Sequence, residues 1–318
     1  MNYLRLVCAA LLFFGCLVTR AQPKPSFRIV PLGVKGGSDE SNLSSYMVAQ
    51  TGSTDNICLD AGTIRYGIRR AVDSGVFAAT EDQVLKQYIK GYLISHPHLD
   101  HVAGLVLNAP DDSTKNIYGM TFCLDVLKNN YFTWKSWANF ADQGEKPTLN
   151  KYQYVELNPG KETAIPNTAF YVEPFPLSHS APNQSTAFLV RAGDAFLLYL
   201  GDTGADSIEG SDDLLRLWRQ IGPLVRQGRL KALFIEVSFP DEQPDKQLFG
   251  HLTPKLLMEE MQALARSSGE RALRRLPILI THIKPAGNRE ALIKKELAAR
   301  NSLRLRLIYP EQARPLEF

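Results

Sequence analysis

Short apolar runs and amphipathic stretches alternate along most of the chain. The apolar runs predict strands at residues 27–31, 45–50, 56–59, 91–95, 152–157, 170–175, 186–191, 195–200, 232–237 and 277–281. Apolar positions at helical spacing predict helices at residues 63–73, 82–89, 211–226, 254–265 and 289–299. Thr253 and Pro254 are typical of a helix start. Two sheets packed back to back with helices outside fit this order as well as a doubly wound sheet does.

The amino-terminal segment has a different pattern. Arg5 precedes an apolar run from Leu6 to Val18, and small residues lie before a possible cut after Ala21. This pattern is typical of a cleaved export signal, and the run is shorter than the roughly 18 apolar residues of a membrane span. We expect residues 1–21 to be a signal peptide and the mature chain to be periplasmic or secreted, without a transmembrane segment. Residues 22–318 are expected to form one α/β domain.

Cysteine usage adds an alternative to this localisation. Cys8 and Cys16 lie in the expected signal, Cys58 in a predicted strand and Cys123 in a probable helix. Acylation of Cys16 would anchor the chain as a lipoprotein, but Phe13 fits poorly three positions before it. We expect Cys58 and Cys123 to be buried free thiols, although an exported protein permits a disulfide.

Composition and charge limit the kinds of partner that the chain can bind. The chain is 44% hydrophobic and 22% charged, as in ordinary globular proteins. Its formal charge of +3 falls to +1 without residues 1–21, because these carry Arg5 and Arg20 and no acid. A near-neutral body argues against a nucleic acid polymer as partner. A small anionic substrate needs only local positive charge, which metal ions can supply. The oligomeric state stays open, with a homodimer among the options.

The segment HPHLDH, residues 96–101, contains three imidazoles and a carboxylate after an apolar run. His96 and His98 can point the same way on an extended segment, and Asp100 and His101 begin the following turn. This spacing can give one pair of ligands to one metal and a second pair to a neighbouring metal. Imidazole and carboxylate suit zinc, and also iron or manganese.

The same segment matches the HxHxDH motif of metallo-β-lactamase-fold hydrolases. The longer stretch HPHLDHVAGLVLNAP resembles the signature of class II cyclic nucleotide phosphodiesterases, except that Ala109 stands where serine is expected. Other segments are similar to this family in the expected order, namely VPLGVKGGSDESNLSSY, FPLSH, YLGDTG, FIEVSF, GHLTP and THIKP. The resemblance implies an αββα four-layer sandwich of the metallo-β-lactamase type, with a dinuclear site along one sheet edge.

The resemblance also implies a ligand set. It assigns His96, His98 and His179 to a first metal, Asp100, His101 and His282 to a second, and Asp202 to a bridge between them. We expect two divalent ions, with zinc favoured over manganese or iron. Two metals about 3.5–4 Å apart can hold a bridging hydroxide near neutral pH and neutralise phosphoryl oxygens. Attack in line on phosphorus would expel the 3′-oxygen of a cyclic nucleotide, and Asp100 would hold the hydroxide.

Glu236 and His251 lie between the Asp202 and His282 segments. In related phosphodiesterases of the fold, a Glu and a His in this order support proton donation to the leaving group. Histidine suits this role because it titrates near neutral pH and a carboxylate stabilises its protonated form. Packing of His251 in the loop before the helix at Pro254 is the alternative.

Other residues carry weaker signals. Asp60 either supports the metal site or belongs to a plain turn. Asn42 could hydrogen-bond the substrate, Lys284 could meet its phosphate, and the loop 36–38 could border it. Three aromatic residues recur every third position and either stack a purine or pack a helix; they are Tyr131, Trp134 and Trp137.

The expected reaction is hydrolysis of 3′,5′-cyclic nucleotides, with cyclic AMP favoured by resemblance. Hydrolysis of lactones, amides or linear phosphodiesters on the same fold is the enzymatic alternative. The Glu236–His251 pair argues against a lactone or amide, because those reactions need an oxyanion stabiliser rather than a leaving-group acid. A nucleotide-binding protein without activity is the least favoured reading, since such proteins usually lose metal ligands.

Overall fold

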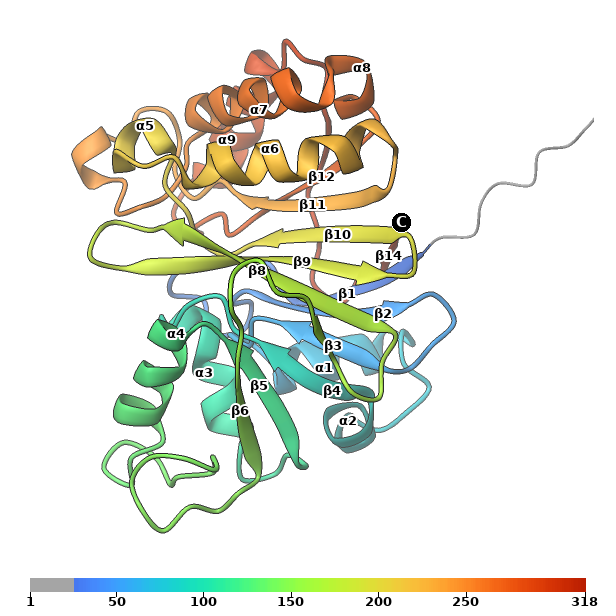
Figure 1. Ribbon diagram of the computed structural model, residues 1–318, viewed down its shortest axis with the longest axis vertical. Coiled ribbons are helices and arrows are strands. Elements are labelled where there is room, and N and C mark those ends of the chain that lie inside the picture. Colours follow the sequence, from blue (N-terminus) through green and yellow to red (C-terminus); the bar gives the residue numbers. More distant parts are fainter. Residues whose placement is uncertain (1–25) are drawn as a thin grey trace, which may run out of the picture.

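Two seven-stranded sheets pack face to face in the computed structural model, which describes residues 26–318 (Figure 1). In spatial order, the first sheet consists of β14 (Leu316–Glu317), β1 (Phe27–Gly33), β2 (Ser45–Gln50), β3 (Asn56–Leu59), β4 (Ile89–Leu93), β5 (Lys115–Gly119) and β6 (Tyr152–Glu156). The second consists of β13 (Arg306–Ile308), β12 (Pro277–Thr281), β11 (Leu230–Glu236), β10 (Ala195–Leu200), β9 (Gln184–Ala192), β8 (Phe170–Ser178) and β7 (Thr163–Ala164). The predicted signal peptide lies outside the described residues.

Alternating side chains of each strand enter different layers of the core. In β1, Phe27 and Ile29 face the second sheet, whereas Val30 and Leu32 face the helices outside the first sheet. The strands of the second sheet follow the same rule, since Leu197 and Leu198 of β10 belong to different clusters. This period of two is what a strand requires when both of its faces are buried.

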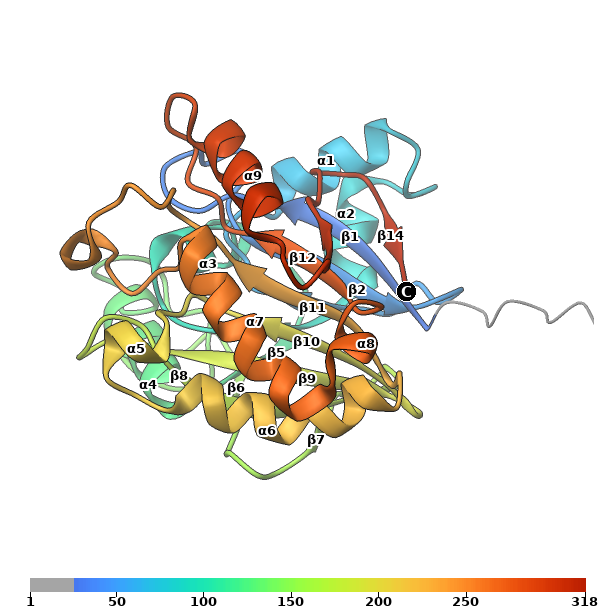
Figure 2. The same cartoon turned by 90° about the horizontal axis from the view of Figure 1, so that it is seen from above.

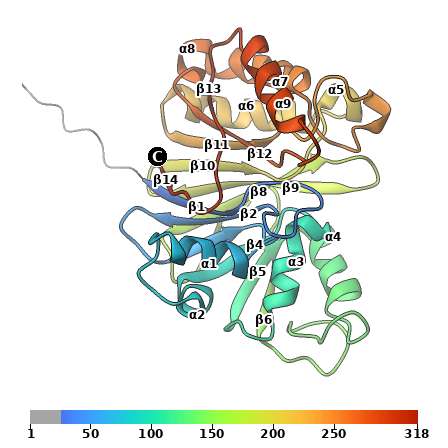
Figure 3. The same cartoon turned by 180° about the vertical axis from the view of Figure 1, so that it is seen from behind.

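Helices cover the outer face of each sheet (Figures 2 and 3). Those on the first sheet include α1 (Arg65–Asp73), α3 (Leu99–Asn108) and α4 (Thr121–Val126). Those on the second include α6 (Asp213–Arg226), α7 (Pro254–Ser268) and α9 (Arg289–Arg300). Shorter helices are α2 (Glu81–Gln83), α5 (Asp206–Glu209) and α8 (Glu270–Leu273). The four-layer αββα sandwich is confirmed, and the doubly wound alternative is wrong.

Parallel pairing brings several loops to one edge of the sandwich. Strands β3, β4, β5 and β6 are parallel neighbours, and so are β10, β11, β12 and β13. The carboxyl ends of parallel strands lie at the same edge of a sheet, where ligand sites of α/β proteins form. The segments that follow β4, β10, β11 and β12 therefore converge.

The predicted elements are found with shifts of a few residues at their ends, and Thr253 caps α7 by accepting from Leu256 N. Helix α3 was not predicted, so Asp100 and His101 lie in a first helical turn rather than in an open turn. The strand β5 was also missed. The predicted helix 82–89 is the short α2 followed by a π-helical turn, Val84–Tyr88.

Two further expectations concern the described part of the chain. Within residues 26–318, no helix has both the length and the apolar composition that crossing a bilayer demands. Cys58 and Cys123 are both free and buried, as predicted. Burial raises the pKa of the Cys58 thiol to about 12, so this thiol stays protonated at neutral pH.

Candidate metal centre

Six histidines and two aspartates gather at the edge where the parallel strands end. His96 and His98 follow β4, and Asp100 and His101 lie in the first turn of α3. The other members come from the second half of the chain; they are His179 after β8, Asp202 after β10, His251 in the segment between β11 and α7, and His282 after β12. The site is thus assembled from both halves of the sandwich.

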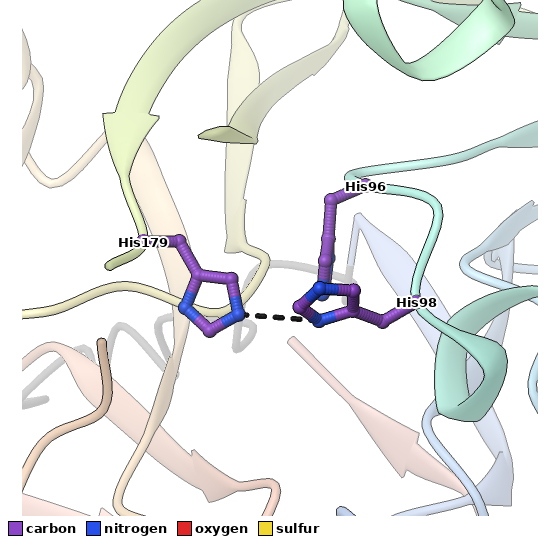
Figure 4. Close-up of side chains that lie close together, drawn as sticks. All are labelled: His96, His98 and His179. Atoms are coloured by element: carbon purple, nitrogen blue, oxygen red, sulfur yellow. Dashed lines mark hydrogen bonds between the residues drawn. The ribbon is translucent and has the colours of Figure 1, made fainter. Parts of the chain in front are cut away.

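A first group contains His96, His98 and His179, drawn in Figure 4. One ligand atom from each residue lies within 4.8 Å of the others. The rings of His96 and His98 are 4.5 Å apart, and His179 Nε2 lies 3.3 Å from His98 Nδ1. His96 and His179 are buried, whereas His98 is exposed at the mouth of the site.

A second group contains Asp100, His101, Asp202 and His282, again with one atom of each within 4.8 Å of the others. His101 Nε2 and Asp100 Oδ2 each lie 3.1 Å from His282 Nε2. The structure therefore brings together all seven residues that the sequence analysis assigned to metal binding, in the two predicted sets. The role of each residue as a ligand stays a prediction.

Four of the five candidate ligand histidines have Nδ1 hydrogen bonds to fixed acceptors. These are His96 to Ser95 Oγ (3.0 Å), His101 to Asp60 Oδ2 (2.7 Å), His179 to Gly250 O (2.8 Å) and His282 to Ser238 Oγ (2.9 Å). Ser95 and Ser238 can accept because each hydroxyl donates its own hydrogen to a carboxylate. A ring that donates through Nδ1 has its Nε2 lone pair free, which is the form that binds a metal.

Asp202 Oδ2 faces these four Nε2 atoms. It lies 3.7 Å from His96, 3.3 Å from His101, 3.9 Å from His179 and 3.2 Å from His282. Lone pairs of a carboxylate and of neutral imidazoles repel one another unless positive charge lies between them. Among the described residues, His96 Nε2 is buried without a hydrogen-bond partner. The donor set therefore fits a pair of divalent cations.

The pKa values agree with this interpretation. Burial lowers the pKa of His96 well below its usual range and that of His179 to about 4, so both rings are neutral. At His101, burial alone would lower the pKa, but Asp202, Asp60 and Asp100 outweigh it and raise the pKa well above its usual value. The acids thus favour a positive charge at this position, and a bound cation would provide one.

Asp60 supports the site from behind, which excludes the plain-turn alternative. It is fully buried and accepts hydrogen bonds from Ser95 N, Ser95 Oγ, His101 Nδ1 and Tyr199 OH at 2.6–2.7 Å. Its backbone is in the left-handed region with φ 53°, and His282 has φ 57°. Non-glycine residues in this region are uncommon and cluster at functional sites.

Glu236 and His251 form a buried pair next to the cluster. His251 Nδ1 donates to Glu236 Oε1 over 2.7 Å, and Thr203 N donates to the same oxygen over 3.1 Å. Burial alone would lower the pKa of His251, but the Glu236 carboxylate outweighs burial and raises it. The pKa of Glu236 is lowered because the charge of His251 outweighs the effect of burial. His251 is thus favoured in its protonated form.

Ser238 is a site residue that the sequence analysis missed. Its hydroxyl joins Glu236 to His282, and so it connects the acid pair with the second ligand group. Serine is too common for its position to be a signal, although FIEVSF lay within the family resemblance. Gly36 belongs to the loop 36–38, and a Cβ there would come within 2.2–2.5 Å of the His282 ring.

The two predicted substrate-binding residues lie at different places. Lys284 follows His282 and is half-buried, with its ammonium 5.1 Å above the ring of Phe239. Asn42 lies in the loop before β2, where its Oδ1 accepts from Val34 N over 3.0 Å. Its carboxamide oxygen is thus already used to hold the loop. Substrate contacts of both residues stay predictions.

The aromatic stripe is not one helical face. Tyr131 ends a π-helical turn, whereas Trp134 is exposed and donates from Nε1 to Pro147 O. Trp137 packs against the core outside the first sheet. Of the three residues only Tyr131 lies in a helical turn, so the expectation of one helical face is wrong.

Comparisons with known proteins show what the chain is similar to. The family model described as cAMP phosphodiesterases class-II matches residues 27–307. A 3′,5′-cyclic-nucleotide phosphodiesterase of Aliivibrio fischeri is 41% identical, over 92% of this chain and 93% of that protein. A protein of Yersinia pestis named a probable 3′,5′-cyclic-nucleotide phosphodiesterase is 38% identical, over 92% and 90% of the two chains.

Solved structures agree on the fold. Unliganded yeast PDE1 superposes with a TM-score of 0.83 at 23% identity, covering 92% of this chain and all of that one. The metallo-β-lactamase fold protein YhfI from Bacillus subtilis gives a TM-score of 0.62 at 17% identity, over 93% and 100% of the two chains. The fold is thus that of the metallo-β-lactamases, and the chain belongs to the class-II cAMP phosphodiesterase family.

Proposed function

We propose that the chain hydrolyses 3′,5′-cyclic nucleotides to nucleoside 5′-monophosphates, with cyclic AMP as the favoured substrate. The observation that carries the proposal is the convergence of four imidazole Nε2 atoms on Asp202 Oδ2, at 3.2–3.9 Å. The names of the two relatives support the substrate class, and the description of the family supports cyclic AMP.

Two divalent metal ions fit this centre. His96, His98 and His179 would hold one ion. Asp100, His101 and His282 would hold the other, and Asp202 would contact both. Zinc is favoured because imidazole and carboxylate are its usual ligands, with manganese or iron as alternatives. Bound there, the ions would lower the pKa of a water between them, which favours a bridging hydroxide, and would neutralise phosphoryl oxygens.

Asp100 would orient the attacking water. Its Oδ2 accepts from Gly37 N over 2.8 Å and lies 3.1 Å from His282 Nε2, so the carboxylate is held at the edge of the site. Attack in line forms a new bond between the water oxygen and phosphorus while the bond to the 3′-oxygen breaks. A fixed water position matters because alignment supplies much of the rate enhancement.

His251 supplies the proton that the leaving 3′-oxygen needs. Glu236 holds His251 through Nδ1, and the other ring nitrogen of His251 is left for the substrate. The alkoxide is a poor leaving group, so protonation as the bond breaks lowers the barrier. The pair favours phosphodiesters over lactones or amides for the same reason. Linear phosphodiesters would use the same groups, and they are the second candidate.

We also propose that the mature chain acts outside the cytoplasm, in the periplasm or secreted. The support is the charge and apolar pattern of residues 1–21. Mass spectrometry of the mature protein should find an amino terminus at Gln22. A lipid-modified Cys16 at the amino terminus would instead indicate an anchored lipoprotein, and an intact Met1 would contradict export.

Removing the carboxylate between the two ligand groups should lower the metal content and abolish activity together. Asp202→Ala is expected to reduce the metal content from about two ions per chain to one or none, because the shared ligand is lost. Elemental analysis by mass spectrometry measures this directly. Asp194→Ala, which removes a fully exposed carboxylate, is the matched control. Two ions and full activity in Asp202→Ala would exclude it from the site.

Removing the proton donor should slow turnover without loss of metal. His251→Ala is expected to keep about two ions per chain and to lower kcat by roughly 10²–10⁴, the usual contribution of general acid catalysis. The loss of kcat should be smaller with a 4-nitrophenyl phosphodiester, because its leaving group needs no proton. Full turnover of cyclic AMP by His251→Ala would contradict the acid role.

The substrate is tested with the purified mature chain loaded with zinc or manganese. Cyclic AMP should give 5′-AMP, faster than cyclic GMP gives 5′-GMP, and a chelator should stop both reactions. Chromatography of the product distinguishes the 5′ from the 3′ isomer. If both cyclic nucleotides stay intact while a lactone or a linear diester is cleaved, the substrate assignment is wrong. Intact metal without any hydrolysis would favour a binding protein.

A further inference from the structure

A cavity of about 370 Å³ opens beside the first ligand group. His98 lines it together with Pro97, so the cavity begins at the exposed member of the group shown in Figure 4. One wall comes from α4 and the π-helical turn that follows it, and the other comes from the loop between β8 and β9. The cavity therefore lies between elements of both sheets, within the size range of small-molecule sites.

Its inner wall is aromatic and apolar. Phe122, Val126 and Tyr131 line it, and Pro182 lies in the opposing loop. The rings of Phe122 and Tyr131 pack from behind against the core outside the first sheet, which fixes their positions. Tyr131 OH also donates to Pro97 O over 2.9 Å, so the wall is tied to the ligand segment.

The rim carries polar groups that can pair with a heterocycle. Asn183 and Gln184 line the cavity, and within residues 26–318 neither side chain has a hydrogen-bond partner. A carboxamide offers both a donor and an acceptor, the combination that pairs with the edge of a purine. The lining residues, all within the described chain, include no Lys, Arg, Asp or Glu, so the cavity does not suit the phosphate itself.

We propose that this cavity binds the base of the nucleotide, stacked on Phe122 and Tyr131, while the phosphate lies at the metal centre. The assignment rests on the proposed function, because it needs a substrate that carries a base. Aromatic side chains bind any nucleobase through its face, and stacking contributes strongly to affinity. Two larger hollows of about 600 Å³ are lined by other parts of the surface and by none of the candidate ligands.

The test is calorimetric binding of two ligands to the metal-loaded mature chain. The ligands are 5′-AMP and ribose 5-phosphate, which differ only in the base. In Phe122→Ala, binding of 5′-AMP should weaken by roughly 5- to 150-fold, as expected for a lost base–aromatic stack. Binding of ribose 5-phosphate should change less than about twofold, since uncontacted surface positions have small effects.

Four further variants separate effects on binding from effects on folding. Tyr131→Ala should also weaken the binding of 5′-AMP but not of ribose 5-phosphate. Tyr131→Phe keeps the ring and loses only the hydrogen bond to Pro97 O, so it should retain the affinity for 5′-AMP. Val126→Phe fills the cavity without removing a wall and should weaken the binding of 5′-AMP as well. Tyr171→Ala removes an exposed tyrosine outside the cavity and serves as the control. Thermal melting of each variant reports its stability.

The outcomes distinguish this assignment from the proposed function. If Phe122→Ala and Val126→Phe weaken the binding of both ligands equally, or of neither, the base does not bind in this cavity. Hydrolysis of cyclic AMP by the unaltered chain would still stand in that case. If cyclic AMP is not hydrolysed, yet the variants weaken 5′-AMP alone, the proposed function is wrong and the cavity remains a base-binding site.

Discussion

Asp60 accepts hydrogen bonds from both sheets at the point where they meet. Ser95 and His101 reach it from the first sheet and its helix, and Tyr199 reaches it from β10 of the second. A buried carboxylate is costly unless its oxygens are satisfied, so these donors must keep their places. The same contacts set the orientation of His101 and, through Ser95, that of His96. One side chain therefore links the packing of the two sheets to the alignment of the candidate ligands.

The acid pair is attached to the metal centre in a similar way. Thr203 follows Asp202 directly and donates to Glu236, while Ser238 lies between Glu236 and His282. A proton donor for a leaving group must be held at a fixed place relative to the group that carries the phosphate. Here hydrogen bonds from residues at neighbouring strand ends hold the Glu236–His251 pair at a fixed position beside Asp202 and His282. Glu236, His251 and the candidate ligands thus belong to one buried hydrogen-bond network.

Sequence reasoning recovered most strands and helices because their signals are local, whereas the four-layer sandwich came from the family resemblance. Strand periodicity, the spacing in HPHLDH and the cap at Thr253 each lie within a few residues, and the family resemblance placed His179, Asp202 and His282. The rest depends on contacts between distant segments. Ser238 is one serine among many until β11 and β12 lie side by side, and the three aromatic residues at helical spacing separate because the helix ends at Tyr131. Helix α3 was missed because its first turn holds two of the candidate ligands, and His98 precedes it without a side-chain cap.

The members of the candidate centre and the strand β14 are made at different times during synthesis of the chain. The members of the centre extend from His96 to His282, and β1 is flanked by β14, Leu316–Glu317. A growing chain therefore cannot complete the centre until β12 has been made, and β1 presents an unpaired edge until β14 arrives. Exposed edges invite pairing with other chains. The topology thus leaves the candidate centre incomplete and the outer edge of β1 unpaired until the last strands of the chain have been made.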